Sequence, residues 1–172
     1  ANNGWYGNVN FRNNPDFGKN QAVSSVLFTE FKYYIPLSKT NLQHVLAFWT
    51  YGQFLTHGDL PYLNLPALGW DKTSRSGRGY IQGLIRGQNL VYLETEYRFP
   101  ITCNQLISGA VFANFTTASD TDRQVKLFHA VQPAFGVGLR ILIDKATRTN
   151  LVLNQAWGRH SKAFYLNAGE TF

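Results

Sequence analysis

The sequence predicts an all-β protein: an antiparallel transmembrane β-barrel of about eight strands per chain, closed alone or forming half of a sixteen-stranded barrel. Three observations indicate this. Segments of about ten residues alternate between apolar and polar side chains, turn sequences separate them, and charged residues make up only 15% of the chain while aromatic residues make up another 15%. No run approaches the ~18 apolar residues of a spanning helix. The length of 172 residues suits a single domain over 1–172.

The alternation is clearest over residues 90–100. Val91 and Leu93 fall on one face of the predicted strand, while Glu94, Glu96 and Arg98 fall on the other, because successive side chains of a strand point to opposite faces. The same pattern predicts strands at 4–13, 25–37, 42–55, 90–100, 105–117, 133–143, 149–159 and 162–172. Each is long enough to cross a bilayer at a tilt, which takes about 9 to 11 residues.

The segments between the strands have the composition of turns and loops. Residues 13–16, 38–41, 102–104 and 145–148 are compact and polar. The stretch from about 56 to 88 is rich in Pro and Gly and far longer than a hairpin loop, so it is either functional or disordered. No boundary between domains and no internal repeat is visible.

The cost of placing charge in hydrocarbon predicts which face meets lipid. A charged side chain at the bilayer midplane costs about 2–4 kcal/mol. We therefore expect the charged face to point inward, with Glu30, Lys32, Glu94, Glu96, Arg98 and Arg140. A soluble barrel would have an apolar interior instead. Aromatic residues near strand ends or on apolar faces favour the membrane as interfacial girdles, namely Trp5, Tyr6, Phe31, Tyr33, Tyr34, Trp49, Tyr51, Tyr97, Phe99, Trp157 and Tyr165.

Other functional classes have little support. The net charge of +6 is scattered rather than clustered, which disfavours a nucleic-acid partner. Cys103 is the only cysteine and the four histidines lack ligand spacing, so we expect no metal and no cofactor. No nucleophile elbow is present, and we expect no enzymatic activity. A hydrolase using His129 or His160 with a loop serine would rest on residue types alone.

The last predicted strand carries the pattern of a sorting signal. Phe164 and Leu166 alternate before the chain ends on Phe172. This pattern is typical of the C-terminal β-signal of bacterial outer-membrane proteins, whose free final strand could be recognised by edge pairing. It predicts a location in the bacterial outer membrane. The alternative is a soluble edge strand that happens to end in Phe.

The long loop and the strands after it carry a series of short motifs. The loop contains Leu68-Gly69 and then Gly77-Arg78-Gly79-Tyr80. The strands contain Glu96-Tyr97-Arg98-Phe99-Pro100, Gly109-Ala110-Val111-Phe112-Ala113-Asn114 and Gly136-Val137-Gly138-Leu139-Arg140. In this order the motifs resemble the C-terminal half of the barrel in the BamA/TamA-like surface-antigen superfamily, whose members assemble outer-membrane proteins or transport polypeptides in two-partner secretion. The resemblance covers essentially the whole chain.

The resemblance implies a role for the loop. In that family the loop folds back into the barrel and its arginine contacts acidic residues on the following strands. It implies that Arg78 pairs with lumen residues drawn from Glu94, Glu96, Asn114 and Arg140. The family has Asp where this chain has Asn114 and often where it has Asn154. We therefore expect Arg78 to pair with Glu96 or Glu94 and to use Asn114 as a neutral acceptor.

The resemblance also implies a function and partners. It implies insertion or transport of polypeptides across or into the outer membrane, without the periplasmic POTRA domains of typical members. The expected partners are outer-membrane lipid and lipopolysaccharide, a client polypeptide, and a homodimer or second barrel half. The alternative is a small outer-membrane pore or membrane-anchor barrel with no assembly role.

Overall fold

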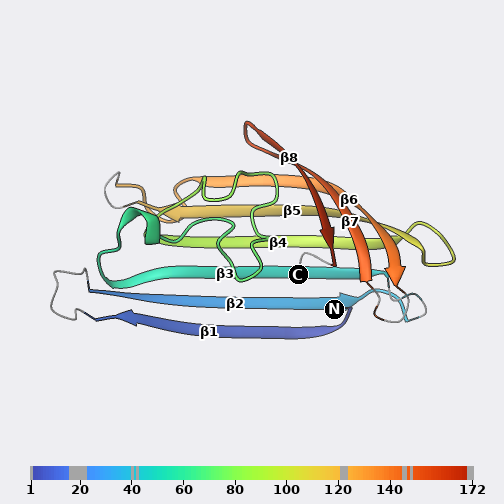
Figure 1. Cartoon of the computed structure of the whole chain (residues 1–172), viewed down its shortest axis with the longest axis horizontal. Coiled ribbons are helices and arrows are strands. Elements are labelled where there is room, and N and C mark those ends of the chain that lie inside the picture. The colour runs from blue at the N-terminus through green and yellow to red at the C-terminus, as the bar shows by residue number, and fades with distance from the viewer. Residues whose placement is uncertain are drawn as a thin grey trace.

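Eight antiparallel strands form one sheet in the order of the sequence (Figure 1). The structure is a computed structural model, and it describes residues 2–15, 23–39, 41, 43–120, 124–144, 147 and 149–169. The strands are β1 (Gly4–Asn14), β2 (Ser24–Pro36), β3 (Val45–Gly58), β4 (Asn89–Pro100), β5 (Ile107–Ser119), β6 (Val131–Asp144), β7 (Thr149–Gly158) and β8 (Ser161–Ala168). All eight predicted strands are present, which confirms the all-β class. No helix among the described residues is long and apolar enough to span a membrane.

The sheet does not close on itself. Strands β2 to β7 each pair with two neighbours, whereas β1 and β8 each pair with one, and the described parts of β1 and β8 make no contact with each other. A barrel closed by this chain alone is therefore wrong for this structure. The arrangement is that of a half-barrel with two free edges, the second of the two predicted forms.

The strand register separates two chemically different faces. Directly paired residues of antiparallel strands share a face, so the pairs Glu30–Tyr51 and Trp49–Glu94 place charged side chains of β2 and β4 together. This inner face carries the charged side chains Arg12, Glu30, Lys32, Glu94, Glu96, Arg98 and Arg140. In the described strands, only Asp144 at the end of β6 and Lys162 beside the β7–β8 turn lie elsewhere. The charged face thus points inward, as the alternation predicted.

The outer face is apolar along its whole width. Large side chains from β1 to β8 stand exposed on it, including Val9, Phe31, Leu93, Val111, Phe115, Phe135, Val137, Phe164 and Leu166. A contiguous exposed apolar surface of this extent is expected only where lipid or another protein covers it.

Several aromatic residues do not lie where the girdle interpretation placed them. Trp49 and Tyr51 lie on the inner face and are at most 2% exposed. They pack with Tyr92, whose ring centroid lies 5.4 Å from that of Trp49 and 5.2 Å from that of Tyr51. The girdle assignment is wrong for these inward side chains, which are Tyr6, Tyr34, Trp49, Tyr51 and Tyr165. Strand parity, rather than nearness to a strand end, decides their environment.

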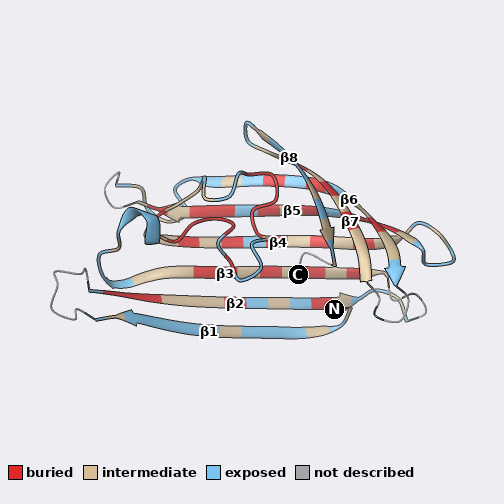
Figure 2. Ribbon diagram, in the orientation of Figure 1, coloured by how far each residue is buried: buried red, intermediate tan, exposed pale blue. Residues whose placement is uncertain are grey.

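The loop between β3 and β4 covers the inner face. It spans residues 59–88 and contains the short 3-10 helix η1 (Tyr62–Asn64). It starts three residues later than predicted, because β3 continues to Gly58, and ends where predicted. The Leu68 amide donates to the Ile85 carbonyl at 2.9 Å, and the Gly83 amide to the Leu68 carbonyl at 2.7 Å. Figure 2 shows buried residues in the middle of β3, β4 and β5 and in the loop above them. The core is therefore a layer between sheet and loop.

Inserting charge into the outer face tests the assignment of the two faces. Val137 and Val131 lie on the same face of β6 and are 48% and 44% exposed, but Val137 is central and Val131 is terminal. We expect Val137→Arg to lower the free energy of unfolding in lipid vesicles by about 2–4 kcal/mol, and Val131→Arg by about 0–1 kcal/mol. Urea titrations measure both. Equal effects of the two substitutions would contradict a lipid-facing outer surface.

Candidate functional site

The tip of the loop brings Arg78 onto the inner face of β4. The side chain is only 2% exposed. Its Nη2 atom donates to Oε1 of Glu94 and, at 2.6 Å, to Oε2 of Glu96. Its Nε atom donates to Oε2 of Glu94 at 3.4 Å. One guanidinium is therefore shared by two carboxylates.

Two more arginines complete the ion cluster around Glu96. Oε1 of Glu96 accepts from Arg98 Nε at 2.7 Å and from Arg140 Nη2 at 3.0 Å. We call Arg78, Glu94, Glu96, Arg98 and Arg140 the arginine–glutamate cluster. All five are at most 5% exposed. Three guanidinium groups facing two carboxylates give it a formal charge of +1. Such a buried cluster holds only if its hydrogen bonds are well made.

The sequence places the strand members of the cluster directly. Glu94, Glu96 and Arg98 share a face because they are two residues apart on β4. Arg140 reaches them from β6 across β5, through the space that Gly138 leaves because it has no side chain. A Cβ atom at Gly138 would lie 2.0 Å from Arg140 Nη1 and 2.2 Å from Oδ1 of Asn154. Only glycine leaves room there for the guanidinium and its acceptor, which are joined at 3.1 Å.

An aromatic ring supports Arg78 from below. The guanidinium carbon lies 3.5 Å from the centroid of the Phe112 ring on β5. A cation over a desolvated ring is stabilised by the negative face of the π-system, by about 2 kcal/mol in favourable cases. Phe112 therefore fixes the plane of the guanidinium while Glu94 and Glu96 fix its edge.

Asn114 contacts the loop differently from the prediction. Its Nδ2 atom donates at 2.8 Å to the backbone carbonyl of Arg78. The expectation that Asn114 accepts from the guanidinium is therefore wrong, because the amide reaches the main chain rather than the side chain. Asn114 Oδ1 and Arg78 Nη1 are both buried without a hydrogen-bond partner among the described residues.

The residues after Arg78 attach the loop to β6, β7 and β8. The Gly79 amide donates to the Tyr165 hydroxyl on β8 at 2.9 Å. Gly79 has a φ of +104°, and a Cβ atom there would lie 2.9 Å from Cβ of Ala134. The Tyr80 hydroxyl donates to the Pro133 carbonyl at 2.5 Å and accepts from the Arg159 amide at 3.1 Å. The segment 77–80 thus links β4 to the last three strands.

Asp71, which is not among the predicted site residues, organises the rest of the loop. Its Oδ2 atom accepts from the Thr73 hydroxyl at 2.6 Å and from the Thr73 amide at 3.1 Å. Its Oδ1 atom accepts from the Ser76 hydroxyl at 2.5 Å and from the Ser76 amide at 3.0 Å. Burial alone would raise the pKa of the Asp71 carboxyl, but the hydrogen bonds from Ser76 and Thr73 outweigh burial and hold that pKa below its usual value of 3.8. The available signal was an Asp with Thr and Ser shortly after it, the pattern of an Asx turn.

The predicted sorting signal lies only partly within the described residues. Phe164 and Leu166 stand on the outer face of the edge strand β8, 64% and 61% exposed. Phe172 lies outside the described residues. Among the residues that the structure describes, no group of three or more His, Cys, Asp or Glu side chains could hold a metal ion.

An antiparallel sheet with an apolar outer face, a charged inner face and a loop fixed inward by a buried arginine defines the class: a membrane β-barrel domain with an inward-folded loop. The whole chain, residues 1–172, matches the family model described as the Omp85 superfamily domain. The chain therefore belongs to the Omp85 superfamily, which confirms the BamA/TamA-like resemblance. This superfamily points to outer-membrane protein assembly or secretion. A comparison with curated proteins found no match.

Removing the loop arginine tests the cluster. We expect Arg78→Ala to lower the free energy of unfolding by about 3–5 kcal/mol, because it leaves the buried Glu94 without its main partner and Glu96 with two of its three. Urea titration in detergent micelles measures the change. The control is Lys72→Ala, which removes an exposed cation from the same loop. An unfolding midpoint for Arg78→Ala equal to that of the wild type would contradict the assigned role.

The pH dependence of the loop tests Asp71. A carboxyl with a lowered folded-state pKa stabilises the fold above its ordinary pKa, and this contribution is lost as the pH falls through the lower value. We expect pepsin to cleave the segment 59–88 increasingly as the pH falls below 3.8. In Asp71→Asn pepsin should cleave the loop already at about pH 5, where the wild-type carboxyl is ionised, and this pH dependence should be removed. Asp59→Asn, a change at an exposed Asp of the same loop, should retain the wild-type profile.

Proposed function

We propose that this chain is the membrane part of an outer-membrane factor that inserts or transports polypeptides. The observation that carries the proposal is the loop 59–88 fixed on the inner face by Arg78, Glu94 and Glu96, in a sheet whose edges β1 and β8 are both free. Free edges supply unpaired backbone groups to an extended segment, and the fixed loop sets the shape of the space that such a segment would enter. Membership of the Omp85 superfamily supports this class of function.

The free edges also require a partner in the membrane. Unpaired backbone groups cost several kcal/mol each in hydrocarbon, so β1 and β8 must be paired there. We propose that eight further strands complete a sixteen-stranded barrel, supplied by a second copy or by another barrel half. Strand direction permits this, because β1 and β8 run antiparallel and a second half can join both edges. Counting the chains per folded particle by native mass spectrometry distinguishes a second copy from another half.

The experiment compares insertion activity between two variants. Purified protein is reconstituted into lipid vesicles, and a client β-barrel protein is added unfolded. We expect faster client folding than in empty vesicles, and a loss of most of that acceleration in Arg78→Ala, because the released loop no longer defines the inner surface. Protease protection of the client measures insertion.

The control is Lys126→Ala, which removes an exposed cation of the β5–β6 loop far along the sequence from the cluster. The vesicles contain equal amounts of folded protein for each variant. The folded fraction is the part that resists denaturation and keeps its shifted mobility on a cold gel. Equal client folding in protein-containing and empty vesicles would favour the alternative, a small pore or membrane anchor. Full activity in a folded Arg78→Ala variant would remove the loop arginine from the mechanism.

A further inference from the structure

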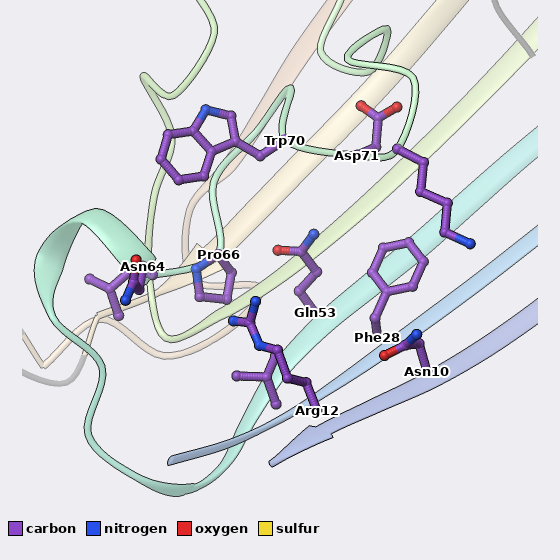
Figure 3. A pocket seen from close by; sticks show the side chains of 11 residues that line it. Asn10, Arg12, Phe28, Gln53, Asn64, Pro66, Trp70 and Asp71 are labelled. Atoms are coloured by element: carbon purple, nitrogen blue, oxygen red, sulfur yellow. The ribbon is translucent and has the colours of Figure 1, made fainter. Parts of the chain in front are cut away.

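A cavity of about 300 Å³ lies between the loop and the inner face of β1, β2 and β3 (Figure 3). The sheet contributes Asn10 and Arg12 from β1, Phe28 from β2 and Gln53 from β3, and the loop contributes Trp70 and Lys72. The volume is at the lower end of the range for ligand sites. The cavity lies beside the free edge β1, away from the arginine–glutamate cluster.

The charged groups of this cavity leave a positive balance. Among the described residues that line it, Arg12 and Lys72 are the cations and Asp71 is the acidic residue. Both Asp71 oxygens already accept hydrogen bonds from the loop itself, from Thr73 and Ser76. The side-chain amides of Asn10 and Gln53 add hydrogen-bond donors, while Phe28 and Trp70 add apolar surface. The cavity therefore suits an acidic group that is flanked by an apolar one.

A second hollow continues the first along the same strands. It measures about 400 Å³, shares Lys72 with the first, and is lined by Tyr6, Lys32 and Glu30 among others. Glu30 offsets the charge of Lys32 and not that of Arg12 or Lys72, because its Oε1 atom accepts from Lys32 Nζ at 3.1 Å and from Trp49 Nε1 at 3.0 Å. The two hollows together leave Arg12 and Lys72 as the cations available to a ligand.

The hollows follow the direction of a strand. On β1 the lining of the two hollows runs from Gly4 to Arg12, and its inward-facing side chains run from Tyr6 to Arg12, a distance of about 20 Å along an extended chain. An extended peptide of about six residues has that length, and it presents every second side chain to the surface beneath it. The shape therefore fits a polypeptide better than a compact small molecule.

We propose that the strip formed by these two hollows binds an extended polypeptide segment with acidic side chains at alternate positions, held by Arg12 and Lys72. This deepens the proposed function and rests on it, since it names the chemistry of the polypeptide that the inner face takes up. Charged contacts of this kind also steer a client toward the surface from a distance.

The test is a binding measurement on the full chain in detergent micelles. The probe is a fluorescent hexapeptide that alternates glutamate and valine, and the reference is its glutamine–valine counterpart. We expect fluorescence anisotropy to show that the acidic peptide binds about tenfold more tightly, with the preference falling as salt is raised. The double variant Arg12→Gln/Lys72→Gln should lose about tenfold of the affinity for the acidic peptide.

The charge-matched control is Lys126→Gln/Lys162→Gln, which should bind like the wild type. Equal affinity for the two peptides, or unchanged binding in the Arg12→Gln/Lys72→Gln variant, would overturn the proposal. Phosphatidylglycerol added to the micelles tests whether the ligand is a lipid headgroup. If binding of this lipid depends on Arg12 and Lys72 but binding of the acidic peptide does not, the strip is a lipid site and the proposal is wrong. Selective peptide binding without client insertion would instead contradict the function proposed above and leave the strip in place.

Discussion

The arrangement of this half-barrel depends on one guanidinium that two carboxylates share. The Arg78 side chain is the only cation that the loop places against Glu94, and it binds Glu96 through the same nitrogen. Without it, β4 would carry a buried carboxylate that, among the residues the structure describes, keeps a hydrogen bond from the Tyr92 hydroxyl alone. The loop position, the closed packing above Phe112 and the contacts of Gly79 and Tyr80 with later strands follow from where that guanidinium must lie.

A second constraint comes from the two solvents of a membrane β-structure. The outer face must be apolar, so only every second residue of a strand can be charged or polar. All of these side chains lie together on the inner face. Charge, aromatic rings and loop contacts therefore compete for one surface. Trp49, Tyr51 and Tyr92 take its centre beside the ion cluster, and glycine at position 138 provides the space that Arg140 needs. The inner face of β1 and β2 is less covered by the loop, and it is there that Arg12 and Lys72 line open hollows.

Much of the fold could be predicted because strand parity is a local property. The alternation around Glu94 and Glu96 is enough to assign both faces, and the motif at 77–80 located the loop segment that enters the inner face. The predictions that failed concern contacts between different strands and the loop, which the sequence of a single strand does not determine. The direction of the Asn114 amide depends on where the main chain of Arg78 passes. Trp49, in the middle of its predicted strand, was placed in a girdle because the two faces of that strand were not assigned. Asp71 lies in a loop, where the hydrogen bonds do not follow a periodic sequence pattern and so could not be predicted from one.

The pairing of Glu94 and Glu96 on one guanidinium has a consequence for how the loop can move. Partial withdrawal would break the short contacts to both carboxylates together, because they meet at the same nitrogen. Two adjacent anions in a low-dielectric interior would then repel each other with Arg98 and Arg140 on one side only. Intermediate positions of the loop are therefore electrostatically unfavourable, because each of them leaves two neighbouring carboxylates without the cation that they share.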